Sequence, residues 1–408
     1  MTRSTTPQFI IPPYLLEQLE RNAGDDERRE RFRRTRELDR LRRERRATAQ
    51  PPVRPERPGS SAEAEGGALD RVVYDAENGT DLPGTQVRAE GEPESKDLAV
   101  NQAYDGTGAT WTMYKECFGR NSVDDMGLPL LSTVHYDRDY DNAFWNGSQM
   151  VFGDGDGQIF KGFTSSIDIT GHELTHGVTQ YTANLDYQGQ SGALNESISD
   201  VFGSLAKQYA LKQSAADADW IIGEGIFAEG VNGVGLRSMK APGTAYDDPR
   251  LGKDPQPADM AHYVETTDDN GGVHLNSGIP NRAFYLTATQ IGGNAYDDAG
   301  KIWYHTLTEG NLAANADFAA FAAATQESAR TLYGDGSTQL AAVTSAWQQV
   351  GVTPAEQQTP AQDAELTRAA AAGLTPPTGQ TTPSIANGAR PDHPHRNTPQ
   401  HGRDGFGR

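Results

Sequence analysis

The chain has 408 residues, a formal net charge of −20 and a single cysteine, Cys117. One cysteine excludes an internal disulfide, and no run of about 18 apolar residues is present that could cross a membrane. The charge is unevenly divided, because residues 1–57 hold 15 arginines and 10 acids whereas residues 58–357 hold 16 bases and 42 acids. A region this acidic repels nucleic acid and anionic membranes, so we expect neither as a partner.

The first 57 residues are rich in arginine, with eleven of them from Arg28 to Arg46. Phe32, Leu38 and Leu41 predict a helix there with a thin apolar face. Nucleic-acid binding is one possible use of the arginines, but docking onto the acidic remainder of the chain uses both charges. No apolar stretch of signal-peptide length precedes Pro12, so classical secretion is not predicted.

The rest of the chain divides by composition. Residues 58–69 are predicted to be a linker and residues 357–408 a disordered tail, because both are poor in large apolar residues. Between them, short runs broken by glycine, aspartate and asparagine predict strands and turns in a lobe from 70 to 167. Helical spacing dominates a second lobe from 168 to 356, so we predict an α+β fold. The expected helices cover 168–181, 192–213, 275–291, 297–309, 315–333 and 337–350.

The junction of the two lobes carries the motif His172-Glu173-Leu174-Thr175-His176. Four residues advance a helix by about 400°, so the two histidines project from one face and can share a metal ion. Imidazole nitrogen suits zinc, and a catalytic zinc site has three protein ligands and one open position. A chance match is the alternative, and the motif alone does not exclude it.

Two acids further along strengthen the metal hypothesis. Glu196 and Asp200 lie one helical turn apart in LNESISDVFGSLA, which otherwise contains apolar or small residues. Glu196 is a candidate third ligand, and Asp200 could hold the far nitrogen of a ligand histidine. A solvated helix face is the alternative, but so apolar a segment has little reason to carry acids there.

These motifs resemble the thermolysin family of zinc metalloendopeptidases, and the resemblance covers residues 70 to 350. It includes DNAFWNGSQMVFGDGDG (141–157), GHELTHGVTQ, YQGQSGALNESISD (187–200), LRSM (236–239) and DNGGVHLNSGIPNRAFYL (269–286). Nineteen residues separate His176 from Glu196, as in that family. Zinc aminopeptidases have eighteen there and a GAMEN-type motif that is not found here, so an exopeptidase is disfavoured.

The resemblance implies a fold of two lobes with the active site in a cleft between them. It also implies that His172, His176 and Glu196 bind one zinc ion, whose bound water attacks the peptide bond. Glu173 would take the proton from this water and deliver it to the leaving amine. The oxyanion would receive hydrogen bonds from His274 and Tyr187, and the orienting partners would be Asp269 for His274 and Asp200 for His172.

Other matching positions concern substrate and calcium. The substrate backbone would be held by Asn142, Ala143 and Arg237. The pocket for the side chain after the cut is apolar and consists of Phe160, Phe163, Ile169, Ile222, Ile226 and Leu236. In the family a double calcium site lies near the active-site helix; here Asp168, Asp219 and Glu224 match three ligands, but Lys207 and Ile221 replace the others. We therefore expect Lys207 to replace the double site, although single calcium ions remain possible.

The N-terminal motif FIIPPYLL (9–16) resembles the short propeptide of the protealysin-like branch, whose members often lack a signal sequence. The sequence thus predicts a monomeric zymogen of a zinc-dependent neutral endopeptidase, with its own propeptide and peptide substrates as partners. It would be cytoplasmic or secreted by a non-classical route. The rivals are an inactive relative that binds peptides and an interaction protein that acts through its arginine-rich arm and tail.

Overall fold

The computed structural model describes residues 8–47 and 67–354, and the predicted linker and tail lie almost wholly outside these ranges. We refer to residues 8–47 as the N-terminal segment and to residues 67–354 as the main body. The main body begins with a sheet and continues as helices, so the predicted α+β class is confirmed. No helix of the described ranges is both long and apolar enough to cross a bilayer.

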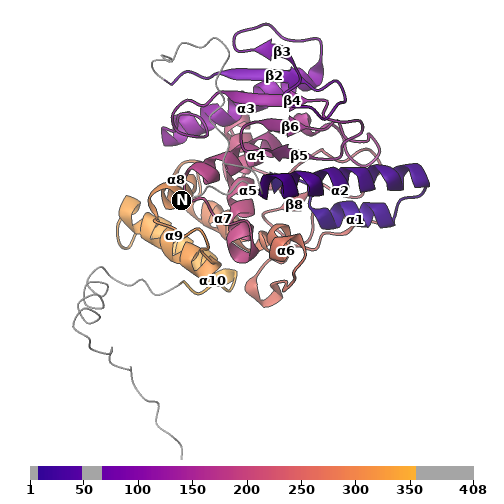
Figure 1. Ribbon diagram of the computed structural model, residues 1–408. Helices are drawn as coiled ribbons and strands as arrows, with labels where there is room; N and C mark the ends of the chain where they lie inside the picture. Colours follow the sequence, from indigo (N-terminus) through magenta and orange to yellow (C-terminus); the bar gives the residue numbers. More distant parts are fainter. Residues whose placement is uncertain (1–7, 48–66, 355–408) are drawn as a thin grey trace, which may run out of the picture. The chain divides into compact units, whose positions relative to one another are not determined.

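The first half of the main body contains most of a six-stranded mixed sheet, to which the N-terminal segment adds one strand (Figure 1). Its spatial order is β1-β5-β6-β4-β2-β3, with antiparallel pairing at both ends and parallel pairing of β4 with β6 and with β2. The outermost strand, β1, belongs to the N-terminal segment and, among the described strands, pairs only with β5. The strands are β1 (Gln8–Phe9), β2 (Arg71–Asp75), β3 (Thr85–Ala89), β4 (Leu130–Val134), β5 (Ala143–Trp145) and β6 (Met150–Phe152).

A long helix that we did not predict, α3 (Leu98–Phe118), packs between this sheet and the helices that follow. Asp97 caps its start by accepting a hydrogen bond from the amide of Ala99, and Gly119 ends it with a left-handed conformation. Within the helix, a Cβ atom on Gly106 would lie 3.0 Å from the Thr170 hydroxyl. The glycine therefore allows α3 to approach the motif helix closely, although glycine lowers helix propensity.

The second half of the main body is helical. The predicted helix at 275–291 divides at Ser277 into α6 and α7, and the other predicted helices occur within a few residues of their expected bounds. The helices are α4 (Ile167–Tyr181), α5 (Gly189–Leu211), α6 (Asp269–Asn276), α7 (Gly278–Ile291), α8 (Asp298–Glu309), α9 (Phe318–Tyr333) and α10 (Thr338–Gln349). Short β-ladders join β7 (Ile221–Ile222) to β8 (Arg237–Ser238) and β9 (Asp247–Asp248) to β10 (Gly252–Lys253).

Two buried helices, α4 and α5, form the centre of the main body and pack against each other through glycines. A Cβ atom on Gly171 would lie 2.9 Å from the Cα of Gly203, and one on Gly203 would lie 2.4 Å from the carbonyl oxygen of Asp168. Larger residues would push the helices apart. The close approach brings the acids of α5 within reach of the histidines of α4.

The N-terminal segment continues from β1 into α1 (Pro13–Arg21) and α2 (Asp26–Ala47), which pack on each other. In the predicted arginine-rich helix, Phe32 is buried as expected, but the buried face continues through Thr35 and Asp39. Arg31 and Arg34 form ion pairs with Asp156 and Asp137 of the main body. Basic residues of the segment thus contact acids of the main body.

Candidate active site

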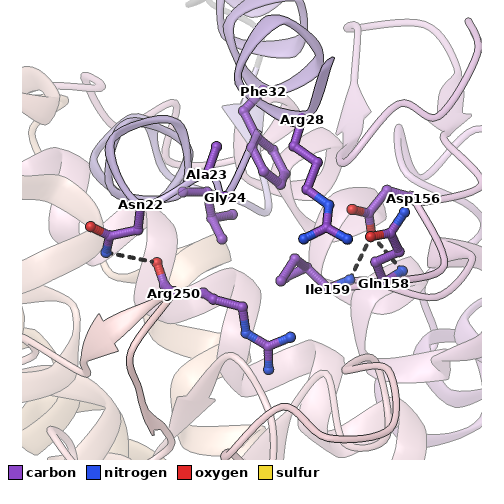
Figure 2. A pocket seen from close by; sticks show the side chains of 10 residues that line it. Asn22, Ala23, Gly24, Arg28, Phe32, Asp156, Gln158, Ile159 and Arg250 are labelled. Carbon is purple, nitrogen blue, oxygen red and sulfur yellow. Dashed lines mark hydrogen bonds between the residues drawn. The ribbon is translucent and has the colours of Figure 1, made fainter. Parts of the chain in front are cut away.

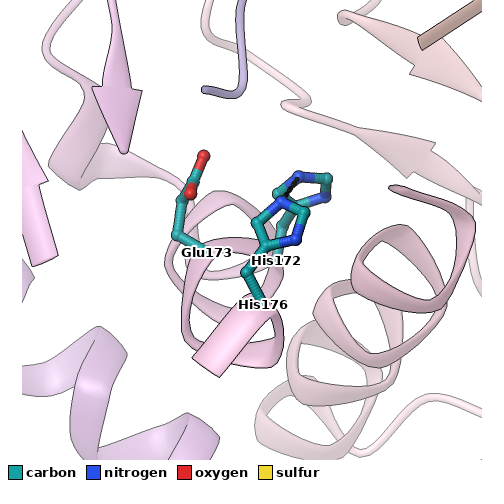
Figure 3. Close-up of side chains that lie close together, drawn as sticks. All are labelled: His172, Glu173 and His176. Carbon is teal, nitrogen blue, oxygen red and sulfur yellow. Dashed lines mark hydrogen bonds between the residues drawn. The ribbon is translucent and has the colours of Figure 1, made fainter. Parts of the chain in front are cut away.

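The two motif histidines lie side by side on α4 (Figure 3). Their Nε2 atoms are 3.0 Å apart, and both rings are buried. Glu196 of α5 completes the group, with carboxylate oxygens 3.4 Å from His172 Nε2 and 3.6 Å from His176 Nε2. Two imidazole nitrogens and a carboxylate that converge in this way fit the donor set of zinc.

Hydrogen bonds fix the other side of each ring. His172 Nδ1 donates to Asp200 Oδ1 at 2.8 Å. His176 Nδ1 lies 2.9 Å from the side-chain oxygen of Asn195 and 3.0 Å from the Ser199 hydroxyl, two partners that the sequence motifs did not predict. Such contacts select the tautomer that leaves Nε2 free for a metal.

Glu173 lies beside the histidines with one carboxylate oxygen fixed. Its Oε2 accepts a hydrogen bond from the backbone amide of Trp145 at 2.9 Å, whereas among the described residues no partner faces Oε1. Glu173, His172 and His176 each offer an atom within 4.8 Å of the others, so this carboxylate also lies close to the metal position. Glu196 Oε2, likewise, has no hydrogen-bond partner within the described ranges. Buried, unpartnered oxygens beside two imidazoles fit a site that receives a cation.

Burial and neighbouring charges raise the pKa values of some residues of this site and lower those of others. Burial raises the pKa of Glu173 well above its usual range and lowers that of His176 to about 3. For His172, burial opposes the charged ring, but the hydrogen bond to Asp200 and the nearby Glu196 carboxylate, 3.4 Å from Nε2, outweigh it and raise the pKa to about 9. The Glu196 carboxyl is also penalised by burial, yet His274, His176 and His172 hold its pKa well below the usual range.

His274 faces the metal group from α6. Its Nδ1 lies 2.7 Å from Asp269 Oδ1, and its backbone amide donates to the other oxygen of the same carboxylate. The backbone at Asp269, Asn270, Gly271 and Gly272 is left-handed, and this turn brings the carboxylate back onto the ring. The Tyr187 hydroxyl lies 3.3 Å from His274 Nε2 and donates a hydrogen bond to Glu196. The two expected oxyanion donors, His274 and Tyr187, therefore lie side by side.

The N-terminal segment crosses this group in an extended conformation. His274 Nε2 donates to the carbonyl oxygen of Phe9 at 3.0 Å, and Arg237 Nη1 donates to that of Ile10 at 3.1 Å. The Ile11 amide donates to Asn142 Oδ1 at 2.9 Å, while Ala143 supplies the carbonyl that accepts from the Ile10 amide. Residues that we expected to hold a substrate backbone therefore hold the chain's own backbone.

Asp200 connects the histidine to the backbone-binding arginine. Besides His172, it accepts two hydrogen bonds from Arg237, at 2.8 and 2.7 Å, and one from Asn281. These contacts outweigh burial and lower the pKa of Asp200 to about 2. From the sequence we expected only the contact with His172. Asp200 therefore orients Arg237 as well as His172.

The predicted specificity pocket is buried and apolar. Its six residues are at most 4% exposed and belong to the same hydrophobic core as Ile10. Phe160 and Phe163 are in ring contact, with centroids 5.7 Å apart. The side chain that follows the Phe9 carbonyl therefore lies in an apolar environment.

The predicted calcium-site residues also come together, around an ammonium group. Lys207 Nζ lies 2.7 Å from Asp219 Oδ2, 3.0 Å from Glu224 Oε2 and 3.5 Å from Asp168 Oδ2. Asp168 is completely buried, which raises its pKa, and the charge of Lys207 opposes this rise.

Comparison with known proteins identifies the class that this fold and site define. Residues 64–180 match the thermolysin metallopeptidase catalytic domain, and residues 183–352 match the thermolysin metallopeptidase alpha-helical domain. The chain belongs to the thermolysin metallopeptidase family, and it is a zinc metalloendopeptidase made as a precursor.

Individual relatives agree with this assignment. The chain is 50% identical over 343 residues to an extracellular metalloprotease of Pectobacterium carotovorum subsp. carotovorum, covering 84% of this chain and 96% of that protein. It is 54% identical over 291 residues to protease PrtS of Photorhabdus sp. (strain Az29), covering 71% and 78%. The solved precursor of protealysin, from Serratia proteamaculans, superposes with a TM-score of 0.77 at 52% identity, covering 85% of this chain and all of the other.

Proposed function

We propose that this chain is the zymogen of a neutral endopeptidase that cuts before apolar residues, and that its N-terminal segment is the inhibitory propeptide. The observation that carries the proposal is the binding of Phe9, Ile10 and Ile11 along β5. Their backbone groups meet His274, Arg237 and Asn142 in the manner of a bound peptide. In this register the Phe9–Ile10 bond takes the place of the bond to be cut, so Ile10 takes the place of the residue after the cut.

The metal-binding residues proposed here are His172, His176 and Glu196. Bound zinc would lower the pKa of a water molecule and polarise the substrate carbonyl. Asp200 and Asn195 hold the two rings in the tautomer that metal binding requires. The donor set supports this assignment, as does the buried Glu196 Oε2, which forms no hydrogen bond within the described ranges and lies 3.4 Å from His172 Nε2.

The proton transfers are assigned to Glu173. Its carboxylate is anchored through Oε2 to the Trp145 amide, which leaves Oε1 to receive a proton from the attacking water. The carboxyl group that has received this proton can then protonate the leaving amine. His274 and Tyr187 stabilise the negative oxygen, since His274 already donates to the carbonyl in the equivalent position.

Selectivity is proposed to follow from the predicted apolar pocket, which belongs to the same hydrophobic core as Ile10. Its lining is apolar and shielded from solvent, so burying a charged side chain there would be costly. We therefore propose that leucine, isoleucine, phenylalanine or valine follows the cut bond.

The carboxylate cluster near α4 is proposed to depend on lysine instead of calcium. Two neighbouring calcium ions need many oxygen ligands, and three carboxylates cannot supply them. Lys207 is within ion-pair distance of all three, and its charge would repel a cation. A single calcium ion is the alternative, and its binding would raise the thermal stability of the protein.

The location and assembly state are also proposals. One relative is named an extracellular metalloprotease, which supports action outside the cell. The charge of −20 favours mutual repulsion of copies and hence a monomer.

An internally quenched peptide with leucine after the intended bond tests the enzyme. The processed protein should cut it before leucine, a zinc chelator should abolish cleavage, and added zinc should restore it. An inactive peptide-binding relative would bind the peptide without cutting it, and cleavage that resists the chelator would contradict the metal mechanism.

A further inference from the structure

A charged contact joins the propeptide segment to the main body away from the zinc group. Arg31 Nη2 of α2 donates to Asp156 Oδ2 at 2.7 Å, and the two side chains are 11% and 0% exposed. The backbone amides of residues 158–160 donate to the other Asp156 oxygen. The main body therefore holds the Asp156 carboxylate in position without needing the contact with Arg31.

A second carboxylate supports the first. Asp141 Oδ1 accepts a hydrogen bond from the Asp156 amide at 2.8 Å, and the Asp141 side chain is completely buried. In the described part of the chain, no hydrogen-bond partner faces Asp141 Oδ2. Burial, and then the charge of Asp156, raise the pKa of Asp141 well above its usual range, while Arg31 opposes this rise. Two neighbouring carboxyl groups are stabilised either by a proton on one of them or by a nearby cation, and in this structure Arg31 supplies a cation.

This carboxylate pair lies next to the peptide-binding residues. Asp141 directly precedes Asn142, whose side chain binds the backbone of Ile11. Beside the pair lies a cavity of about 180 Å³ between the segment and the main body (Figure 2). Arg28 and Phe32 of α2 line one side, and Asp156 and Ile159 line the other. When the segment leaves, Asp156 therefore loses its cover and Arg31 together.

Arg250 of the main body lies near enough for its charge to act on Asp156, but the ion pair of Asp156 is with Arg31. Arg250 lines the same cavity, but its Nε and Nη2 atoms donate to Asp248 at 2.9 Å. The same Nη2 also donates to the carbonyl oxygen of Gly230. The hydrogen bonds of Arg250 therefore go to Asp248 and Gly230 and not to Asp156.

We propose that Asp156, supported by Asp141, forms a subsite for a basic side chain of the substrate. Arg31 occupies this subsite in the zymogen, and an arginine or lysine of the substrate occupies it in the processed enzyme. Because Asn142 binds the second residue after the substrate-like bond, the basic residue belongs on the C-terminal side of the cut. This inference rests on the endopeptidase function and adds a charge preference to its apolar one.

The test uses processed enzyme and quenched peptides that share leucine after the cut. The second, third and fourth positions after the cut carry arginine, glutamine or glutamate in turn. At the best position, the ratio of kcat/KM for arginine over glutamine should be about ten, as for one charge-assisted hydrogen bond. Glutamate at that position should be disfavoured relative to glutamine.

Asp156→Asn should bring the arginine-to-glutamine ratio close to one, because asparagine keeps an oxygen for the amides of residues 158–160. Asp335→Asn is the control. It makes the same charge change at a side chain that is 84% exposed and pairs with Arg330, and it should retain the arginine-to-glutamine ratio of the wild type. A ratio near one in the wild type, with the glutamine peptide cut normally, would overturn the subsite. Failure to cut either peptide would instead contradict the endopeptidase function.

A second arm does not require Asp156 to be changed. In the precursor, Arg31→Gln should speed self-processing several-fold, because the segment loses its cation in the subsite. Arg33→Gln is the matched control, since Arg33 lies on the same helix and pairs with Glu30 of that helix. Equal processing of both variants would overturn the proposal, as would a calcium ion that binds at Asp156 and leaves no arginine preference.

Discussion

Replacing Lys207 with methionine would leave three carboxylates around an uncharged side chain. Asp168 is fully buried, whereas the side chains of Asp219 and Glu224 are 31% and 56% exposed. Removing one partner of a buried ion pair costs about 3–5 kcal/mol, and the exposure of two of the acids places this case lower, at about 2–3 kcal/mol. For a domain of this size, such a loss lowers Tm by about 3–5 °C.

The assay is thermal unfolding in a Glu173→Gln background, so that self-digestion does not distort the transition. Lys207→Met should unfold about 3–5 °C below its parent. Lys301→Met, which removes an exposed lysine from α8, should change Tm by no more than a degree or two. Equal Tm values for the two variants would show that Lys207 does not neutralise the cluster.

Calcium supplies the decisive comparison. The parent should show the same Tm with calcium and with a calcium-selective chelator, because Lys207 fills the site. Lys207→Glu should be unstable without calcium and gain several degrees when calcium is added, since four acids can then coordinate the ion. A large calcium-dependent rise in the parent would refute the replacement of the calcium site by lysine.

Three further outcomes follow from the described contacts. Glu173→Gln should lower peptide cleavage by about 10²–10⁴-fold and keep the precursor at full length. Metal analysis should find equal zinc in mutant and wild type, and equal cleavage would contradict the role of Glu173. Ile10→Asp should weaken the propeptide, so the precursor should cleave peptides earlier than an Arg33→Gln control; unchanged latency would contradict the assigned register. Hydrogen bonds with Asp154 and Asp97 raise the pKa of His135 to about 9. This stabilisation is complete below pH 6.5 and lost as pH rises through 9, so His135→Asn should lower Tm by about 2–4 °C at pH 6 and by less than 1 °C at pH 10. A deficit that is constant with pH would refute the charged contact.

The sequence predicted the helices of the second half because their apolar residues recur at helical spacing. It did not predict α3, whose segment contains Gly106, Gly108 and several threonines. These residues disfavour an isolated helix. The helix forms because the small residues allow close packing against α4 and the sheet, a tertiary effect that local patterns do not reveal.

The site was predictable to the extent that its residues lie in contiguous motifs. The motif of α4 and the acids of α5 have spacings that fit metal binding, and the resemblance to the thermolysin family favoured this interpretation over a chance match. Contacts between distant segments were not predictable in the same way. Asp39 of α2 bonds to Tyr140 and to Asn142 Nδ2, yet in the sequence it is one acid within an arginine-rich run. Its only signal is the helical spacing of Asp39 with Phe32 and Thr35.

The position of β1 at the end of the sheet has a consequence for which proteins can be cut. Once the segment leaves, β5 becomes an edge strand only three residues long, and an incoming chain must complete the sheet by adding a strand. A stretch already folded into a helix, or paired within its own sheet, cannot offer its backbone in this way. The enzyme should therefore discriminate by conformation, acting on frayed termini, exposed loops and unfolded chains while leaving compact proteins intact.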